Sequence, residues 1–307
     1  MPPHRFLAFP TWHLAARYLA SLILCAGAAH AASLPLPPLS AAPSAAHLPG
    51  KVIWADLVTP DLAAAEAFYS GLFGWTFRNI HSGETNYAVA MVSGRPIGGI
   101  LQRPIPAGEQ HQPHWLTFVA VADADRAARL AVNDGAKELA KPTTYPGRGR
   151  QAVLSGPDGA VFAILASATG DPGDYLAEPG EWIWSVLLTS DPDKAAKFYR
   201  AVFGYDLFDL PSADGLEHVV LSSQDYARAG INSLPKDSRH RRAHWLNFVR
   251  VADTDATAAK AVTLGGRVLV EPRVDRHGGK IALLADPAGA PFGIMEWTAS
   301  DTKTEPQ

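Results

Sequence analysis

One stretch, Trp54-Ala-Asp-Leu-Val-Thr-Pro-Asp61, leads through an Ala-rich run to Phe68-Tyr69 and then Phe73-Gly74-Trp75, and the chain repeats it. The second copy runs Trp184-Ser-Val-Leu-Leu-Thr-Ser-Asp191 to Phe198-Tyr199 and Phe203-Gly204-Tyr205. The copies are 130 residues apart (184 − 54 = 130), and the same offset relates His114-Trp115-Leu116 to His244-Trp245-Leu246. A register kept over this length predicts a duplicated domain whose two copies share one topology.

The residues of this stretch predict a strand followed by a capped helix. Residues 53–58 alternate with a period of two, which favours a strand with two different faces. Asp61 is a candidate N-cap, residues 62–69 are good helix formers, and Gly71 and Gly74 supply the stop. Three short strands are expected next, at 75–78, 87–92 and 97–101, so the first half of the unit is βαβββ.

The second half of the unit repeats this order. A strand is expected at 115–121, and Asp123 or Asp125 caps a helix over 126–132. Strands follow near 138–139, at 151–154 and at 161–165. The second unit has the same elements from Trp182 to Thr298, so the sequence predicts an α+β protein of two tandem domains.

Four βαβββ modules, with Asp-helix-Phe-Tyr-x3-Phe-Gly in the first of each pair and Pro-Asp/Ala-Gly-x-x-Phe in the second, resemble the vicinal oxygen chelate superfamily. This is the glyoxalase, bleomycin-resistance and extradiol dioxygenase group. The Pro96-Ile-Gly-Gly-Ile100 segment and His114-Trp115 resemble a tandem branch described as lactoylglutathione lyase-related. The match covers about residues 51–299 and implies that each pair of modules curls one mixed sheet around a cleft.

The predicted domain organisation has six parts. They are a signal peptide (1–31), a Pro/Ala-rich disordered tether (32–50), glyoxalase-like domain 1 (51–167), a linker (168–180), glyoxalase-like domain 2 (181–299) and a C-terminal tail (300–307). Because the linker is short, we expect the two domains to pair within one chain, with the strands 54–58 and 184–188 covering one another.

The first 31 residues have the order of an export signal. Arg5 and Arg17 precede an apolar run, residues 18–28, that ends in Ala29-His30-Ala31. The run is about 11 residues, short of the roughly 20 that span a bilayer, so a permanent anchor is the weaker alternative. Lipid attachment at Cys25 is another, although Leu24 is bulky for such a site. We therefore expect a periplasmic or secreted protein, cleaved near Ala31.

Composition excludes some partners. The chain has 27 Lys and Arg against 30 Asp and Glu, with no long run of either sign, which argues against nucleic acid. Cleavage would remove the only cysteine, so the mature chain needs no disulfide. No Gly-x-Ser-x-Gly and no phosphate-binding loop is present.

The resemblance also implies where a metal would be held. Metal-dependent members carry His, Gln or Glu on each first strand and a carboxylate on each last strand. Here the first-strand positions hold Trp54, Leu116, Trp184 and Leu246, and the last-strand positions hold Ala163, Gly293 and, in the first module, Gly98 or Gly99. Glu296 faces the other side of its strand from Gly293. No cofactor is predicted, the alternative being a divalent metal on ligands not recognised in this way.

Six residues are candidate ligand contacts: Trp54, His114, Phe118, Trp184, His244 and Phe248. The tryptophans would give a planar ligand a stacking wall, or else fill the core in place of a metal. His114 and His244, with His111 and His240 nearby, are either acid-base or ligand groups or solvated loop residues bonded to backbone. Tyr69 and Tyr199 are expected in the core. At a cleft rim, solvated loops are expected to hold Arg148, Arg150, Arg273, Arg276 and Lys280, the alternative being contact with an anionic ligand.

Two classes of function remain open. The first is an exported, metal-independent binding protein for a small, partly aromatic molecule. The second is a metal-dependent lyase or dioxygenase whose ligands lie elsewhere, for example at His114 and His244 with a carboxylate. The scaffold is shared by both classes, so the sequence leaves enzymatic activity undecided.

Overall fold

The computed structural model describes residues 34–40, 44, 46–104, 113–209, 218–234, 242–275 and 279–297. The predicted signal peptide, the tail, His111, His240 and Arg276 lie outside these residues. Among the described residues, no helix is long and apolar enough to cross a membrane.

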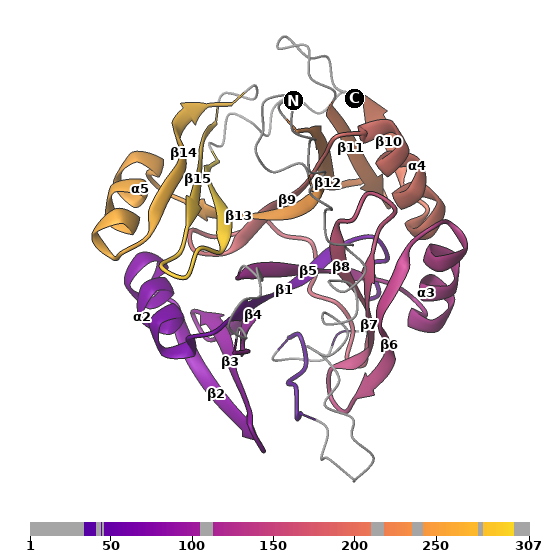
Figure 1. Cartoon of the computed structure of the whole chain (residues 1–307), viewed down its shortest axis with the longest axis horizontal. Helices are drawn as coiled ribbons and strands as arrows, with labels where there is room; N and C mark the ends of the chain where they lie inside the picture. The colour runs from indigo at the N-terminus through magenta and orange to yellow at the C-terminus, as the bar shows by residue number, and fades with distance from the viewer. Residues whose placement is uncertain are drawn as a thin grey trace, which may run out of the picture.

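The first domain forms one mixed sheet of two βαβββ modules (Figure 1). Its strands lie in the order β2-β3-β4-β1-β5-β8-β7-β6, so the modules meet where β1 pairs antiparallel with β5. The elements are β1 (Val52–Thr59), α2 (Leu62–Phe73), β2 (Thr76–Ser82), β3 (Thr85–Val92), β4 (Arg95–Gln102), β5 (His114–Ala120), α3 (Ala124–Asn133), β6 (Lys137–Tyr145), β7 (Gly149–Ser155) and β8 (Val161–Ser167).

The second domain repeats this topology, in the order β10-β11-β12-β9-β13-β16-β15-β14. Its elements are β9 (Trp182–Thr189), α4 (Pro192–Phe203), β10 (Asp206–Asp209), β11 (His218–Ser223), β12 (Tyr226–Ser233), β13 (His244–Val251), α5 (Thr254–Thr263), β14 (Arg267–Val274), β15 (Lys280–Ala285) and β16 (Pro291–Glu296). The α+β fold with two tandem domains is confirmed.

Each helix begins at an aspartate that the sequence repeats. Asp61 accepts a hydrogen bond from the Ala64 amide at 2.9 Å, and Asp123, not Asp125, caps α3 in the same way. Asp191 and Asp253 cap α4 and α5. These caps satisfy amide donors that a helix N-terminus otherwise leaves unpaired.

The two domains pack through the faces that carry their helices. Helix α2 lies beside α5, and α3 beside α4, on opposite sides of the molecule (Figure 1). Each pair shares one apolar core that contains residues of both domains. Between them β5 contacts β13, where Thr117 Oγ1 donates to Asn247 Oδ1 at 3.1 Å. The central contact is thus made mainly by β5 and β13, rather than by the expected strands 54–58 and 184–188.

Tyr69 and Tyr199 lie in these shared cores, as predicted. Trp115 and Trp245 donate indole hydrogen bonds to the two hydroxyls, each at 3.0 Å. The Tyr69 hydroxyl also donates to Asp286 of the other domain at 3.3 Å. The copies are therefore equivalent in their packing but differ in this bond between domains.

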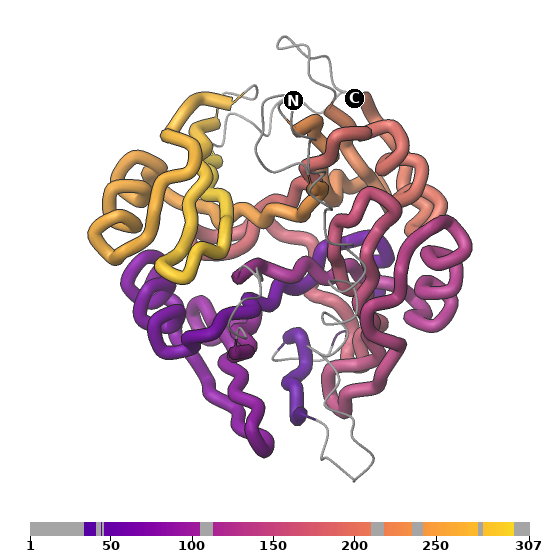
Figure 2. The backbone as a smooth tube through the Cα atoms, in the orientation of Figure 1, coloured from indigo at the N-terminus to yellow at the C-terminus, as the bar shows by residue number. Residues whose placement is uncertain are grey.

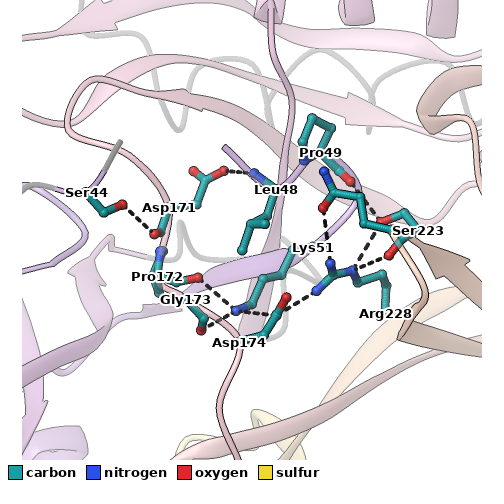
Figure 3. A network of polar contacts seen from close by, with 11 residues as sticks. Ser44, Leu48, Pro49, Lys51, Asp171, Pro172, Gly173, Asp174, Ser223 and Arg228 are labelled. Atoms are coloured by element: carbon teal, nitrogen blue, oxygen red, sulfur yellow. Dashed lines mark hydrogen bonds and ion pairs between the residues drawn. The ribbon is translucent and has the colours of Figure 1, made fainter. Parts of the chain in front are cut away.

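A polar network fastens the segment before β1 to the linker and to the second domain (Figure 3). The Asp171 carboxylate accepts from the Leu48 amide at 2.7 Å. The Asp174 carboxylate lies 2.9 Å from Lys51 Nζ and 2.7 Å from Arg228 Nη1. Because Arg228 extends from β12, one carboxylate of the linker joins three parts of the chain.

Candidate functional site

Each sheet has an inner face, opposite its helices, to which all six predicted contact residues belong. In the first sheet β1 pairs with β5, so that Trp54 lies opposite Phe118. His114, the first residue of β5, lies opposite Val58. In the second sheet Trp184 lies opposite Phe248, and His244 opposite Leu188. Directly paired residues of antiparallel strands project to the same face. The structure therefore brings together three predicted residues on each inner face.

A chain of polar contacts is buried on the inner face of the first sheet. The Asp56 carboxylate accepts from Trp54 Nε1 at 2.7 Å and from the Tyr87 hydroxyl at 2.8 Å. The Tyr87 oxygen in turn lies 3.5 Å from Arg148 Nη2, and the Arg148 guanidinium stacks 4.2 Å from the centre of the Trp54 ring. Burial raises the pKa of Asp56, and the charge of Arg148 opposes that rise. Burial also raises the pKa of Tyr87, so its hydroxyl stays a donor.

Asp56 was not among the predicted site residues, and the prediction for Arg148 is wrong. Arg148 was expected in a solvated loop, yet its side chain is only 1% exposed. It is buried because Trp54 and Tyr87, distant in sequence, supply a stacking face and an acceptor. The sequence could have predicted the position of Asp56. It is two residues from Trp54 in a strand, and side chains two positions apart in a strand lie on the same face.

The inner face of the first sheet is covered by the chain itself. Residues 34–40, here called the strap, lie between the arm β2–β4 and the arm β6–β8 (Figure 2). Leu36 and Leu39 are buried in one apolar cluster with Trp54 and Phe118, and Arg148 Nε donates to the Pro37 carbonyl at 2.7 Å. The strap thus differs from the disordered tether that its composition predicts.

The second sheet has the same backbone with different side chains. Register places Val186 at the position of Asp56, and His218 at that of Tyr87. Trp184 and Leu188 are partly exposed, whereas Trp54 is 2% exposed. Within the described chain, the apolar cluster of this face consists of the sheet's own strands and Trp297, with no counterpart of the strap. This face is the more accessible of the two.

Other predicted residues are also placed. His244 Nδ1 lies 3.0 Å from the Arg242 carbonyl, which agrees with the interpretation of a histidine bonded to backbone. Arg150 and Lys280 pair with Asp125 and Asp255, acids near the N-termini of α3 and α5.

Both domains match known protein families. The Glyoxalase/Bleomycin resistance protein/Dioxygenase superfamily profile matches residues 51–164, and the Glyoxalase-like domain profile matches residues 184–295. The chain belongs to the glyoxalase/bleomycin resistance protein/dioxygenase superfamily. This confirms the resemblance to the vicinal oxygen chelate group.

Relatives with different descriptions align with most of this chain. "Putative glyoxylase CFP32" of Mycobacterium tuberculosis is 33% identical over 245 residues, 79% of this chain and 93% of that protein. "Anthracycline biosynthesis protein DauV" of Streptomyces sp. (strain C5) is 35% identical over 260 residues, 81% of this chain and 94% of that protein. The Mn(II)-bound glyoxalase of Novosphingobium aromaticivorans has a TM-score of 0.57 at 16% identity, over 81% of this chain and 83% of that one, which supports the fold alone.

The residues at the family's metal positions do not fit a metal ion. A Cβ added at Gly293 would lie 2.2 Å from the Phe248 ring, and one at Gly99 would lie 1.9 Å from the Tyr87 hydroxyl oxygen. Aromatic side chains therefore fill the space into which carboxylates would extend. Glu296 faces the helix side, where it accepts from the Thr254 amide at 2.6 Å. In the part of the chain that the structure describes, no three His, Cys, Asp or Glu side chains are grouped to hold a metal.

Proposed function

We propose that this protein binds a small, partly aromatic molecule on the inner face of the second sheet, without a metal at the family's positions. The observation that carries the proposal is the contrast between two equivalent tryptophans. Trp54 is buried beneath the strap, whereas Trp184 is partly exposed above an apolar floor that contains Leu246 and Phe248. A partly exposed indole beside a second ring is a suitable stacking surface for a planar ligand.

Polar groups at this face favour a ligand that also carries oxygen. His244 lies at the start of β13, next to the apolar floor. The Trp297 indole N–H is buried and has no hydrogen-bond partner among the described residues. A buried donor without an acceptor costs free energy, so a ligand carbonyl or hydroxyl that reaches it gains affinity.

The name of one relative supports such a ligand. DauV is named for anthracycline biosynthesis, and anthracyclines contain planar fused rings with carbonyl and hydroxyl groups. We therefore expect fused-ring aromatic ketones and quinones to be ligands of this chain.

Titration of the purified full chain tests the proposal. Doxorubicin and smaller hydroxylated fused-ring ketones would be titrated while ligand and tryptophan fluorescence are measured. Trp184→Ala removes the stacking surface and should weaken binding by about thirtyfold, the loss typical of an aromatic anchor worth about 2 kcal/mol. The control is Val262→Ala, which shortens an exposed apolar side chain of α5, on the helix side of the sheet, and should leave affinity within about twofold. Failure of every compound to bind, or equal affinity of Trp184→Ala and wild type, would contradict the proposal.

We further propose that the protein is exported and cleaved near Ala31. The support is the order of charged, apolar and small residues within positions 1–31. N-terminal sequencing of protein isolated from its native host should find a mature chain that begins near Ala32. A chain that begins at Met1 in the cytoplasm would contradict export.

A further inference from the structure

We propose that the first domain contains a second ligand site, for which the strap is a displaceable internal ligand. This inference concerns the inner face of the first sheet and does not depend on ligand binding by the second. The site beneath the strap would take a neutral apolar molecule that carries a carbonyl oxygen and a hydroxyl or amide donor.

The strap has the sequence properties of a ligand. Its residues, Leu34-Pro-Leu-Pro-Pro-Leu-Ser40, include three prolines, whose rings fix φ and so limit the conformations of the free segment. The segment turns at Pro35, where the Leu36 amide donates to the Leu34 carbonyl at 2.7 Å, and both Leu36 and Leu39 are buried in the apolar cluster of the inner face. A segment whose conformations are restricted in advance loses less entropy on binding.

The attachment of the strap is local. Leu36 and Leu39 supply buried apolar contacts, and Arg148 Nε holds the Pro37 carbonyl at 2.7 Å. The next anchors lie at Ser44, whose Oγ donates to the Asp171 carbonyl at 3.0 Å, and at Leu48, whose amide donates to the Asp171 carboxylate at 2.7 Å (Figure 3). Release of residues 34–40 therefore leaves the fastening of residues 44–51 intact.

The contacts beneath the strap favour a neutral carbonyl. Asp56 accepts hydrogen bonds from Trp54 and Tyr87, and the Tyr87 oxygen lies 3.5 Å from Arg148 Nη2, so these buried polar groups already pair with one another. A buried charge on the ligand would be costly, whereas a neutral carbonyl can replace the Pro37 oxygen as the acceptor for Arg148 Nε.

Gln151 supplies an independent sign of an unused contact. It lies on β7 between residues of the same inner face, since Val153, two positions on, belongs to the cluster beneath the strap. The side chain is 7% exposed, and its Oε1 atom is buried with no hydrogen-bond partner among the described residues. The strap leaves this acceptor unsatisfied, and a ligand with an O–H or N–H donor can satisfy it.

The test releases the strap in the full chain and supplies it again as a peptide. Leu36→Asp with Leu39→Asp places two charges where the leucines are buried, which frees the face. Binding of a fluorescent peptide of residues 33–40 is then measured by anisotropy. The peptide should bind the double variant at least tenfold more tightly than wild type, because the chain's own strap no longer competes for the face. The matched control, Leu130→Asp with Leu176→Asp, changes two exposed leucines and should behave as wild type.

The same assay identifies the ligand class separately from the second domain. 6-Acetyl-2-naphthol, a neutral naphthalene with a ketone at one end and a hydroxyl at the other, should displace the peptide. Arg148→Met in the double variant should weaken peptide binding at least tenfold, through loss of the Pro37 contact. Leu39→Ala, which keeps the strap uncharged, should give an intermediate peptide affinity and serves if the double variant does not fold. Absence of peptide binding to folded strap variants, or no displacement by 6-acetyl-2-naphthol, would overturn the proposal, whatever Trp184→Ala does in the second domain.

Discussion

Substituting the two equivalent tryptophans one at a time should produce opposite effects. Trp54→Ala removes a side chain that is 2% exposed, stacked against Arg148 at 4.2 Å and hydrogen-bonded to Asp56 at 2.7 Å. Removal of a buried Trp typically costs about 3–5 kcal/mol, partly through the cavity that it leaves. Because the two domains share their apolar cores, we expect them to unfold together. For a unit of that size each kcal/mol lowers Tm by about 2–4 °C, so a loss of about 4 kcal/mol lowers Tm by roughly 8–16 °C.

Trp184→Ala removes a partly exposed ring at the equivalent position, beside Val186 instead of an aspartate. We expect a loss of about 1 kcal/mol, or roughly 2–4 °C in Tm, together with the thirtyfold loss of ligand affinity. Differential scanning calorimetry of both variants, followed by titration at a temperature where each is folded, measures the two effects. Equal losses of Tm, or a Trp54→Ala protein that keeps its Tm but loses ligand affinity, would refute the reasoning.

Two further predictions concern the junction between domains. Tyr69→Phe should lower the free energy of unfolding by about 1–2 kcal/mol more than Tyr199→Phe, as measured by chemical denaturation. Both hydroxyls accept from a tryptophan, but Tyr69 also donates to Asp286 of the other domain. Equal effects would show that this bond between domains contributes nothing. Burial acts to raise the pKa of Asp174, but hydrogen bonds and charge from Arg228 and Lys51 outweigh it and lower that pKa. The stability that this ionised carboxylate contributes is present above the unfolded pKa of about 3.9 and is lost as pH falls through the folded pKa. Asp174→Asn should therefore make the Tm fall less steeply with pH in that acidic range. The control is Asp134→Asn, at an exposed position. An unchanged slope in Asp174→Asn would contradict this linkage.

The regular parts of the fold could be predicted because their signals are local. Asp61 and its repeat at Asp191 mark helix starts, and period-two alternation marks the strands around them. Because the two copies are 130 residues apart, the strands and helices predicted for the first domain also predicted those of the second. The register also placed Trp54, Phe118 and His114 on one face, since strand parity alone decides which side a residue faces.

The occupant of that face could not be predicted in the same way. The strap lacks helical or strand periodicity, and its prolines are equally typical of a disordered segment. Its order depends on contacts with residues such as Arg148, more than a hundred positions away along the chain. Arg148 is equally unpredictable, because an arginine between glycines is usually solvated and only the folded chain supplies Trp54 as its stacking partner.

Native mass spectrometry of the purified full chain, with and without a fused-ring ketone that binds, tests the central claim most directly. The difference between the two inner faces predicts that each wild-type chain binds one ligand at ligand concentrations near the Kd. Trp184→Ala should abolish this binding at the same concentrations. A second bound ligand should be seen only when the strap is released. It also predicts no stoichiometric divalent metal. Two ligands of equal affinity on the wild-type chain would contradict the account. So would one tightly held metal per domain whose removal by chelator abolishes a measurable turnover.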